Sequence, residues 1–297
     1  MLNKPFHTTV LKKEAIKALE IKKDHWYLDC TFGGGGHTYQ ILKNGGQVIA
    51  IDQDQDALDQ AKKVLGDFDS DRYCLVKSNF NHLDQIVKNH QSKISGILFD
   101  LGVSSYQLTG NQRGFSFQKD EPLDMRMDPD NQTVTAKDLV NGLYEKELAQ
   151  LLTEYAEEKF AKTIARHIVD ARKYQPIHTT GQLRQIIEPI YQARFSTKSK
   201  INPATKTFQA LRILVNDELE NLKIALKKSI AILGSNGRIV VISFHSLEDR
   251  IVKSAFKQWQ ESNLGTILTN KPIIPSDFEK DLNPASRSAK LRIFAKN

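Results

Sequence analysis

Apolar residues follow two different periods along the first hundred residues. Runs that are apolar on both faces, such as Gln47–Asp52, are typical of strands buried in a parallel sheet. Between these runs, apolar residues recur at the spacing of an amphipathic helix, as in residues 10–21. Strands separated by helices in this way predict a doubly wound α/β sheet. The predicted strands are 26–30, 47–52, 73–77 and 97–100, and the predicted helices are 10–21, 38–43, 54–65 and 81–89.

A different pattern begins after Asp100. Residues 102–131 are polar, rich in Gly, Pro and Asp, and show no clear period. Beyond them, helical stripes such as that of Leu148, Leu151 and Leu152 follow one another without an intervening strand. Thr179 and Gln182 predict a capping box at the start of one of these helices. The α/β pattern then resumes with a helix at 217–233 and strands at 238–243 and 290–295. We therefore expect an all-helical domain at 106–206, inserted into a sheet domain formed by 1–105 and 207–297.

Composition narrows the class of protein. The chain has 297 residues, 40% of them hydrophobic, which is enough for a substantial core. It has no apolar run of membrane-span length and no apolar stretch of a signal peptide, so we expect a cytoplasmic protein without a membrane segment. Cys30 and Cys74 have no CxxC neighbour, and no cluster of His, Cys and carboxylates has ligand spacing. We therefore expect neither a disulfide framework nor a metal site.

The charge balance favours a polyanionic partner. The net charge is +7 and the pI is near 9.2. Residues 194–206 contain four basic residues and no acidic one, as expected of a loop that contacts a phosphate backbone. A loop that is merely solvated fits this composition about as well.

A glycine-rich turn follows the first predicted strand, and the acidic residue Asp29 before it indicates what kind of ligand the turn binds. Residues 29–37 read DCTFGGGGH. In a dinucleotide-binding turn, the loop amides hold a pyrophosphate, which a carboxylate would repel. Asp29 instead suits a ligand that has no phosphates and is positively charged. S-adenosylmethionine (SAM) is such a ligand, so the turn predicts methyl transfer, with Asp29 and Gly33 near the cofactor.

Other candidates follow the ends of neighbouring strands, where doubly wound sheets bind ligands. Asp52 is placed to accept hydrogen bonds from two ribose hydroxyls, although the same placement serves NAD. Asp54 already supplies an acid to the next helix, which favours a functional role for Asp52. Phe80 either stacks on adenine or belongs to the core, with about equal support.

Asp100 ends an apolar strand, where burying an unpaired carboxylate is costly. A cytosine amino group is a poor nucleophile because its lone pair is delocalised into the ring. Transfer to it needs acceptors that hold both N–H bonds and direct the lone pair at the methyl group, and Asp100 with the Leu101 carbonyl provides such a pair. Asp100 binding only the cofactor is equally consistent with the sequence.

Several long motifs lie along the chain. They are HTTVL (7–11), DCTFGGGGH (29–37), DLGVSSYQL (100–108), RGFSF (113–117), PLDMRMDP (122–129), TFQALR (207–212), SFHSLEDR (243–250) and SRSAKLR (286–292). Together they resemble the motifs of the RsmH (MraW) family, over essentially the whole chain. The resemblance implies a class I SAM-dependent methyltransferase with a helical insertion, which modifies the 4-amino group of one cytidine in the decoding region of 16S rRNA, within the small ribosomal subunit.

The resemblance also implies site residues and shows departures. Gly34 makes a fourth consecutive glycine where relatives often have a larger residue. Many amino methyltransferases follow the strand-end acid with two prolines and an aromatic, whereas this chain has residues 101–103, LGV. The aromatic that stacks on the target base must then come from elsewhere, and Tyr106, Phe115 and Phe117 are the candidates. The cofactor contacts carried over are Gly35, Gly36, His37, Asp52, Phe80, Asp100 and Gln107.

Basic residues near these motifs are candidate RNA contacts. Arg126 lies between Asp124 and Asp128, so a local ion pair is a serious alternative for it. Ser246 and Asp249 fit a capping box, which explains part of their motif structurally. Arg287 and Arg292 fit phosphate contacts and solvated surface about equally. The candidate RNA contacts are Arg113, Arg126, Lys198, Lys200, Arg212, His245 and Arg250.

Two other classes of function compete with a methyltransferase. A dinucleotide-dependent oxidoreductase is disfavoured by Asp29 and by Thr38, which stands where the third glycine of GxGxxG belongs. A non-catalytic RNA-binding or ribosome-assembly factor that senses SAM is disfavoured by the carboxylate of Asp100. The sequence leaves open whether the substrate is naked rRNA or an assembled subunit, and which oligomer forms.

Overall fold

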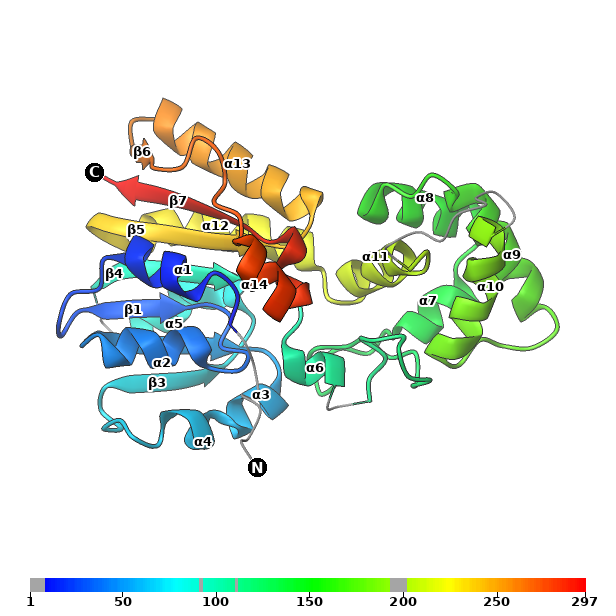
Figure 1. Cartoon of the computed structure of the whole chain (residues 1–297), viewed down its shortest axis with the longest axis horizontal. Coiled ribbons are helices and arrows are strands. Elements are labelled where there is room, and N and C mark those ends of the chain that lie inside the picture. The colour runs from blue at the N-terminus through cyan, green and yellow to red at the C-terminus, as the bar shows by residue number, and fades with distance from the viewer. Residues whose placement is uncertain (1–8, 91–92, 110–111, 193–201) are drawn as a thin grey trace. The chain divides into compact units, whose positions relative to one another are not determined.

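The computed structural model describes residues 9–90, 93–109, 112–192 and 202–297. The chain forms two compact units, which we call the sheet unit, Met1–Tyr106 with Leu219–Asn297, and the helical unit, Gln107–Glu218 (Figure 1). The chain thus returns to the sheet unit later than the sequence suggested, since α11 (Thr205–Val215) packs on α7 (Ala136–Gly142) and α8 (Glu145–Ala156) of the helical unit.

The sheet unit is built on one mixed sheet of seven strands in the order β3-β2-β1-β4-β5-β7-β6. β1 to β5 run parallel, whereas β7 is antiparallel to both β5 and β6. The prediction of an α/β sheet is confirmed, but the sheet is not parallel throughout, because β7 runs antiparallel to its two neighbours. The strands are β1 (Trp26–Asp29), β2 (Gln47–Asp52), β3 (Tyr73–Lys77), β4 (Ile94–Asp100), β5 (Leu233–Ser243), β6 (Gly265–Ile267) and β7 (Lys290–Lys296).

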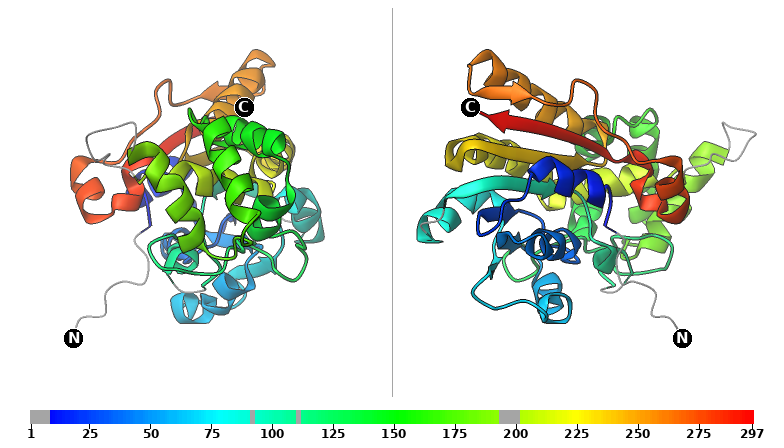
Figure 2. Two further views of the ribbon diagram at one scale, coloured as in Figure 1. Left: turned by 90° about the vertical axis from the view of Figure 1, so that its right-hand side faces the viewer. Right: turned by 60° about the vertical axis from the view of Figure 1, so that its left-hand side comes forward.

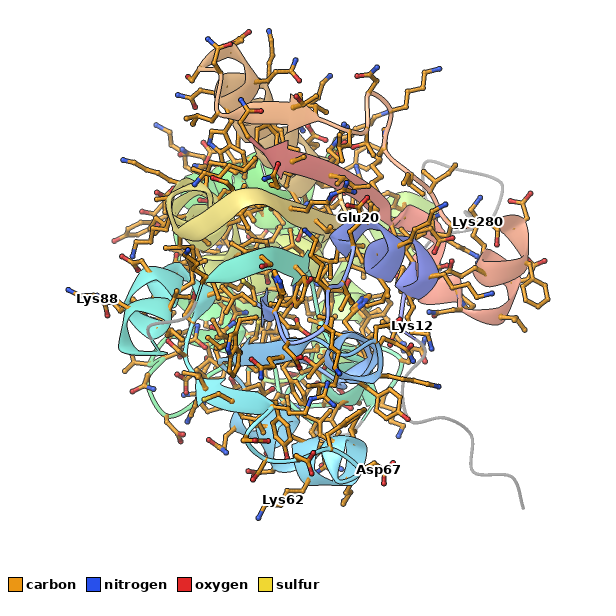
Figure 3. The ribbon with its side chains drawn as sticks, turned by 90° about the vertical axis from the view of Figure 1, so that its left-hand side faces the viewer. Lys12, Glu20, Lys62, Asp67, Lys88 and Lys280 are labelled. Atoms are coloured by element: carbon orange, nitrogen blue, oxygen red, sulfur yellow. The ribbon has the colours of Figure 1, made fainter. Side chains whose placement is uncertain are left out.

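Alternating strand residues contribute to two apolar cores, one on each face of the sheet. Helices cover both faces of the sheet (Figures 1 and 2). Val48 and Ala50 of β2 pack on one face with α1, α2, α3 and α4, while Ile49 and Ile51 pack on the other with α5, α12 and α13. Charged side chains such as Lys12, at the start of α1, lie on the outside of this unit (Figure 3). The helices are α1 (Lys12–Leu19), α2 (Gly36–Lys43), α3 (Gln55–Asp59), α4 (Ala61–Leu65), α5 (Leu83–His90), α12 (Glu218–Ile232), α13 (Ser246–Glu261) and α14 (Asp277–Leu282), with short 3₁₀ turns η1 (Phe80–His82) and η2 (Pro284–Ser288).

The helical unit has its own apolar stripes. Leu148, Leu151 and Leu152 are buried on α8, as their spacing predicts. Thr179 and Gln182 exchange the two hydrogen bonds of a capping box at the start of α10, as predicted. Its helices are α7 (Ala136–Gly142), α8 (Glu145–Ala156), α9 (Ala161–Arg172), α10 (Thr180–Gln192) and α11, and the short α6 (Ser105–Thr109) spans the boundary between the units.

One predicted helix is interrupted. The segment 54–65 divides into α3 and α4 because the N–H of Gln60 donates to the Ala57 carbonyl, three residues back rather than four. Asp54 caps α3 by accepting from the N–H of Asp56, which is the role that the sequence assigned to it. In the part of the chain that the structure describes, no helix is both long and apolar enough to cross a membrane.

Candidate functional site

Asp29 lies behind the glycine-rich turn and is completely buried. Its carboxylate accepts hydrogen bonds from the Thr31 N–H at 3.2 Å and from the Thr38 hydroxyl at 2.7 Å. It therefore joins the end of β1 to the first turn of α2. Burial raises the pKa of Asp29 to about 6, although His37 and the two hydrogen bonds oppose the rise. The oxygens of Asp29 already accept hydrogen bonds from Thr31 and Thr38. A cation in front of the turn would therefore interact with Asp29 by electrostatic attraction at a distance.

Asp52 ends β2 and holds the turn from the neighbouring strand. It accepts from the N–H of Gly33 at 2.8 Å and from the N–H of Asp54 at 2.9 Å. Burial again raises the pKa to about 6, against these two hydrogen bonds. Since β1 and β2 are parallel neighbours, Asp29 and Asp52 lie at the same edge of the sheet.

His37 and Asp100 form a close pair at this edge. The Nε2 of His37 lies 3.3 Å from Oδ2 of Asp100, and the side chains are 4% and 15% exposed. Neither ring nitrogen of His37 makes a hydrogen bond to any residue that the structure describes, and the same holds for Oδ1 of Asp100. The Asp100 N–H donates to the Thr31 hydroxyl at 2.7 Å, which ties the end of β4 to the glycine turn. Buried polar atoms that have no hydrogen-bond partner in the protein are suited to hydrogen bonds with a ligand.

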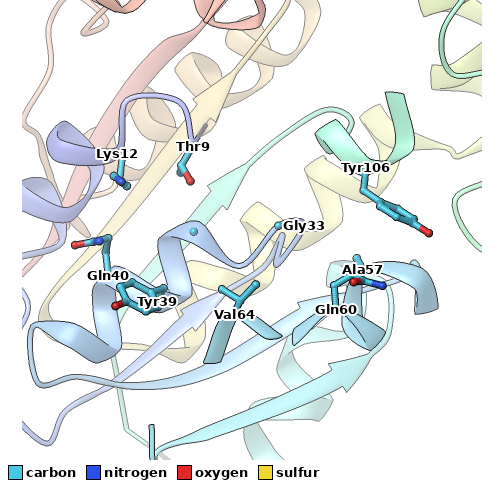
Figure 4. Close-up of a pocket in the computed structure, with 11 residues that line it drawn as sticks. Thr9, Lys12, Gly33, Tyr39, Gln40, Ala57, Gln60, Val64 and Tyr106 are labelled. Carbon is cyan, nitrogen blue, oxygen red and sulfur yellow. The ribbon is translucent and has the colours of Figure 1, made fainter. Parts of the chain in front are cut away.

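The glycines of the turn are required by space as well as by conformation. Gly35 has φ +72°, and a Cβ there would lie 2.8 Å from the Phe32 ring; at Gly36 a Cβ would overlap the Thr9 hydroxyl. Beside the turn lies a pocket of about 300 Å³, shown in Figure 4. Its lining includes Gly33, Gly34, Gly36, Thr9, Lys12 and Tyr106.

Phe80 and Gln107 differ in how the structure places them. Phe80 begins η1 directly after β3, is partly exposed, and meets Phe99 of β4 edge-on at 5.8 Å between ring centroids. Its ring therefore packs on the core, as one of the two alternatives raised for it requires, while stacking on adenine stays a prediction. Gln107 is buried and begins the helical unit. The sheet unit itself thus brings together Gly35, Gly36, His37, Asp52, Phe80 and Asp100, with Asp29 and Gly33.

Three arginines proposed for RNA contact are held inside the helical unit. Arg126 forms a two-pronged ion pair with Asp124, both hydrogen bonds being 2.7 Å, as the structural alternative anticipated. Arg113 donates to the carbonyls of Arg126 and Met127 and covers the ring of Phe115 at 5.6 Å. Arg212 pairs with Glu218 through two bonds of 2.8 Å, and its side chain is 15% exposed. These contacts show how each arginine supports the fold of the unit.

The motif at 243–250 is engaged at the start of α13. His245, rather than Ser246, caps this helix, and Glu248 completes the capping box by accepting from the His245 N–H. Asp249 accepts from Arg292 at 2.6 Å and from Lys290 at 3.3 Å, so Arg292 is buried instead of facing solvent. Arg250 and Arg287 are exposed, and Lys198 and Lys200 lie outside the described residues.

The candidate aromatics have separate environments. Phe115 is buried, and Phe117 packs on Phe208 at 4.9 Å, both within the helical unit. Tyr106 lines the pocket of Figure 4. Phe244 was not predicted from the sequence. It follows β5 and lies against the loop after Asp100, and it is identified by the pairing of β4 with β5, which no sequence pattern indicates.

Comparisons with known proteins identify the family of the chain. Residues 4–297 match the model of the MraW methylase family. Ribosomal RNA small subunit methyltransferase H of Sulfurihydrogenibium sp. (strain YO3AOP1) is 49% identical, over 97% of this chain and 98% of its own length. The proteins of the same name from Sulfurihydrogenibium azorense and Brevibacillus brevis are 48% and 45% identical, each over at least 97% of this chain and 98% of their own length. The chain therefore belongs to the MraW methylase family.

Proposed function

We propose that this protein transfers a methyl group from SAM to the 4-amino group of a cytidine in the decoding region of 16S rRNA. The observation that carries the proposal is the group of Asp29, Asp52 and Asp100 at adjacent strand ends, with His37 beside Asp100. The substrate is the RNA within the small ribosomal subunit, and the protein acts in the cytoplasm, where that subunit is made.

The residues at this edge fit SAM, a class I methyltransferase cofactor with two positive charges and two ribose hydroxyls. Three carboxylates supply negative charge, and raised pKa values at Asp29 and Asp52 mark an edge where a cation would be stabilised. The ring nitrogens of His37 and one oxygen of Asp100 make no hydrogen bond to the residues that the structure describes, so they are suited to polar groups of a ligand. Gly33 and Gly35 allow close approach of a ligand to the backbone. The cofactor residues are Gly35, Gly36, His37, Asp52, Phe80, Asp100 and Gln107.

The bound cofactor supplies a methyl group attached to a positively charged sulfur. The protein's task is to present an amine with little basicity. Asp100 accepts a hydrogen bond from one N–H and the Leu101 carbonyl accepts the other, which directs the nitrogen lone pair toward the methyl group. As the N–C bond forms, the bond between that methyl group and sulfur would break with its electron pair left on the sulfur, and the surplus amino proton would pass to the Asp100 carboxylate. Such positioning can account for about 7–11 kcal/mol of the barrier.

The test is transfer of labelled methyl from SAM to small subunits that lack the modification, with naked rRNA in parallel and nucleoside analysis of the product. We expect label on the 4-amino group of cytidine. SAM binding without transfer to either RNA would instead support a SAM-sensing assembly factor. Absence of SAM binding would contradict the cofactor site itself.

Substitution of Asp100 separates its two possible roles. Asp100→Asn keeps an acceptor oxygen but removes the negative charge and the proton acceptor. We expect the rate of transfer at saturating SAM to fall by about 10²–10⁴-fold. The Kd for SAM should rise by about tenfold or less, because Asn still accepts the hydrogen bond and only the contribution of the charge is lost. Calorimetric titration beside the transfer assay distinguishes this from a loss of cofactor binding alone.

A further inference from the structure

The ends of β4 and β5 bring two loops together beside Asp100. The strands are parallel neighbours, and Asp100 is paired with Ile242. The pairing continues one step further, because the Leu101 N–H donates to the Ile242 carbonyl at 2.9 Å. Residues that follow Asp100 and residues that follow Ile242 therefore share one edge of the sheet unit.

Phe244 lies against the loop that leaves Asp100. A Cβ added to Gly102 would come within 3.5 Å of the Phe244 ring, and Gly102 has φ +98°. The loop backbone and the aromatic ring are thus close neighbours. Phe244 is only partly buried, although it also packs on the apolar core of α1 and α2. A partly exposed aromatic residue therefore lies beside the loop that leaves Asp100.

The backbone of Phe244 is held in place from the α13 side. Its N–H donates to the carboxylate of Glu248 at 2.8 Å, and Glu248 is 2% exposed. The following residue, His245, caps α13, and Asp249 fixes the first turn of that helix to Arg292 of β7. An aromatic residue whose backbone is anchored in this way loses little conformational entropy when a planar ligand stacks on its ring.

We propose that the Phe244 ring is the surface on which the target cytosine rests while Asp100 and the Leu101 carbonyl hold its amino group. The assignment rests on the proposed function. A cytosine presents its amino group at the edge of the ring, and the flat face of the ring is available for stacking. A site that holds the base therefore needs hydrogen-bond acceptors at that edge and an aromatic ring against that face. Residues 101–103 contain no aromatic, and Phe244 supplies one from the adjacent strand end. Phe244 is thereby a positioning residue for the substrate base.

The test compares aromatic and aliphatic replacements. Phe244→Leu keeps the apolar bulk that packs on the core, whereas Phe244→Tyr and Phe244→Trp keep a stacking face. We expect Phe244→Leu to lower kcat/KM for the RNA by about 10- to 100-fold, the range expected for one base stacked on an aromatic ring. The Kd for SAM stays unchanged, and Tyr or Trp restores most of the activity. Phe278→Leu is the matched control, since Phe278 is 75% exposed on α14.

A binding measurement adds a readout independent of catalysis. An RNA fragment with the target cytidine is compared with the same fragment carrying an abasic site there. We expect the wild-type protein to prefer the intact fragment and Phe244→Leu to lose that preference. The proposal is overturned if wild type shows no preference, if Phe244→Leu retains full activity, or if every replacement, Tyr included, fails together with SAM binding. Failure of wild type to methylate any RNA would instead refute the proposed function.

Discussion

At the scale of single residues, two acids have pKa values that are raised toward neutral pH. Asp29 and Asp52 have pKa values of about 6 because both are buried beside other acids, despite two hydrogen bonds each. The ligand-free protein therefore carries an electrostatic cost at pH 7, when these groups are ionised. A cationic ligand would relieve that cost, which is one physical reason to place SAM here.

The first consequence concerns cofactor affinity. Binding of a cation favours ionised carboxylates, so affinity should fall as pH drops below the pKa of the free protein. We expect the Kd for SAM to rise about tenfold between pH 7 and pH 5 for each acid that must lose its proton. Asp52→Asn should bind SAM more weakly at pH 7 and show a flatter pH dependence. Isothermal titration across this range measures both effects, and an unchanged Kd would contradict the argument.

The same pKa shift acts on stability with the opposite sign. A raised pKa gives a contribution that is fully present below the ordinary value of 3.8 and is lost as pH rises through about 6. Without SAM, Asp52→Asn should therefore be more stable than wild type at pH 7, and this difference should shrink toward pH 5. Thermal unfolding of the two proteins without cofactor tests it, and a gap that widens on acidification would refute it.

At the scale of elements, α13 depends on a charged contact with the sheet. Burial raises the pKa of Asp249, but the ion pair with Arg292 outweighs it, so the pKa lies below its ordinary value. Asp249→Ala would leave a guanidinium that is 9% exposed without its carboxylate. We expect a loss of about 3 kcal/mol in the free energy of unfolding, measured with urea. The matched control is Asp170→Ala in the exposed pair with Lys173, where we expect no measurable change.

Elements were predictable from the sequence where their own residues determine them. The strand β2 and the capping box of α10 match the prediction because apolar runs and cap residues act locally. β6 has three residues, too few to show a period, and no period encodes that β7 runs antiparallel. The partners of Arg126 and Arg292 illustrate the difference: the first lies two residues away and was anticipated, whereas the second lies forty-three residues away and was not.

At the scale of the whole molecule, the sheet unit draws its cores from its own residues. Both apolar clusters of the sheet consist of residues before 107 or after 218. The helical unit separately buries stripes on α8, α9, α10 and α11. The two units therefore contribute different residues. The strand-end acids belong to the sheet unit, while Gln107 and the ion-paired arginines Arg126 and Arg212 belong to the helical unit.

Replacing residues 107–218 by a flexible linker of about ten Gly and Ser residues tests this division. Since no core residue of the sheet is removed, we expect the shortened protein to unfold cooperatively, as followed by circular dichroism. It should bind SAM more weakly than the full chain, because Gln107 is absent. Asp52→Asn should raise the Kd for SAM by the same factor in the shortened protein as in the full chain. It should not methylate rRNA, because the basic segment 194–206 and the rest of the helical unit are missing. Methyl transfer at the rate of the full chain would show that the sheet unit alone recognises the RNA, and an unfolded product would show that its core is not self-sufficient.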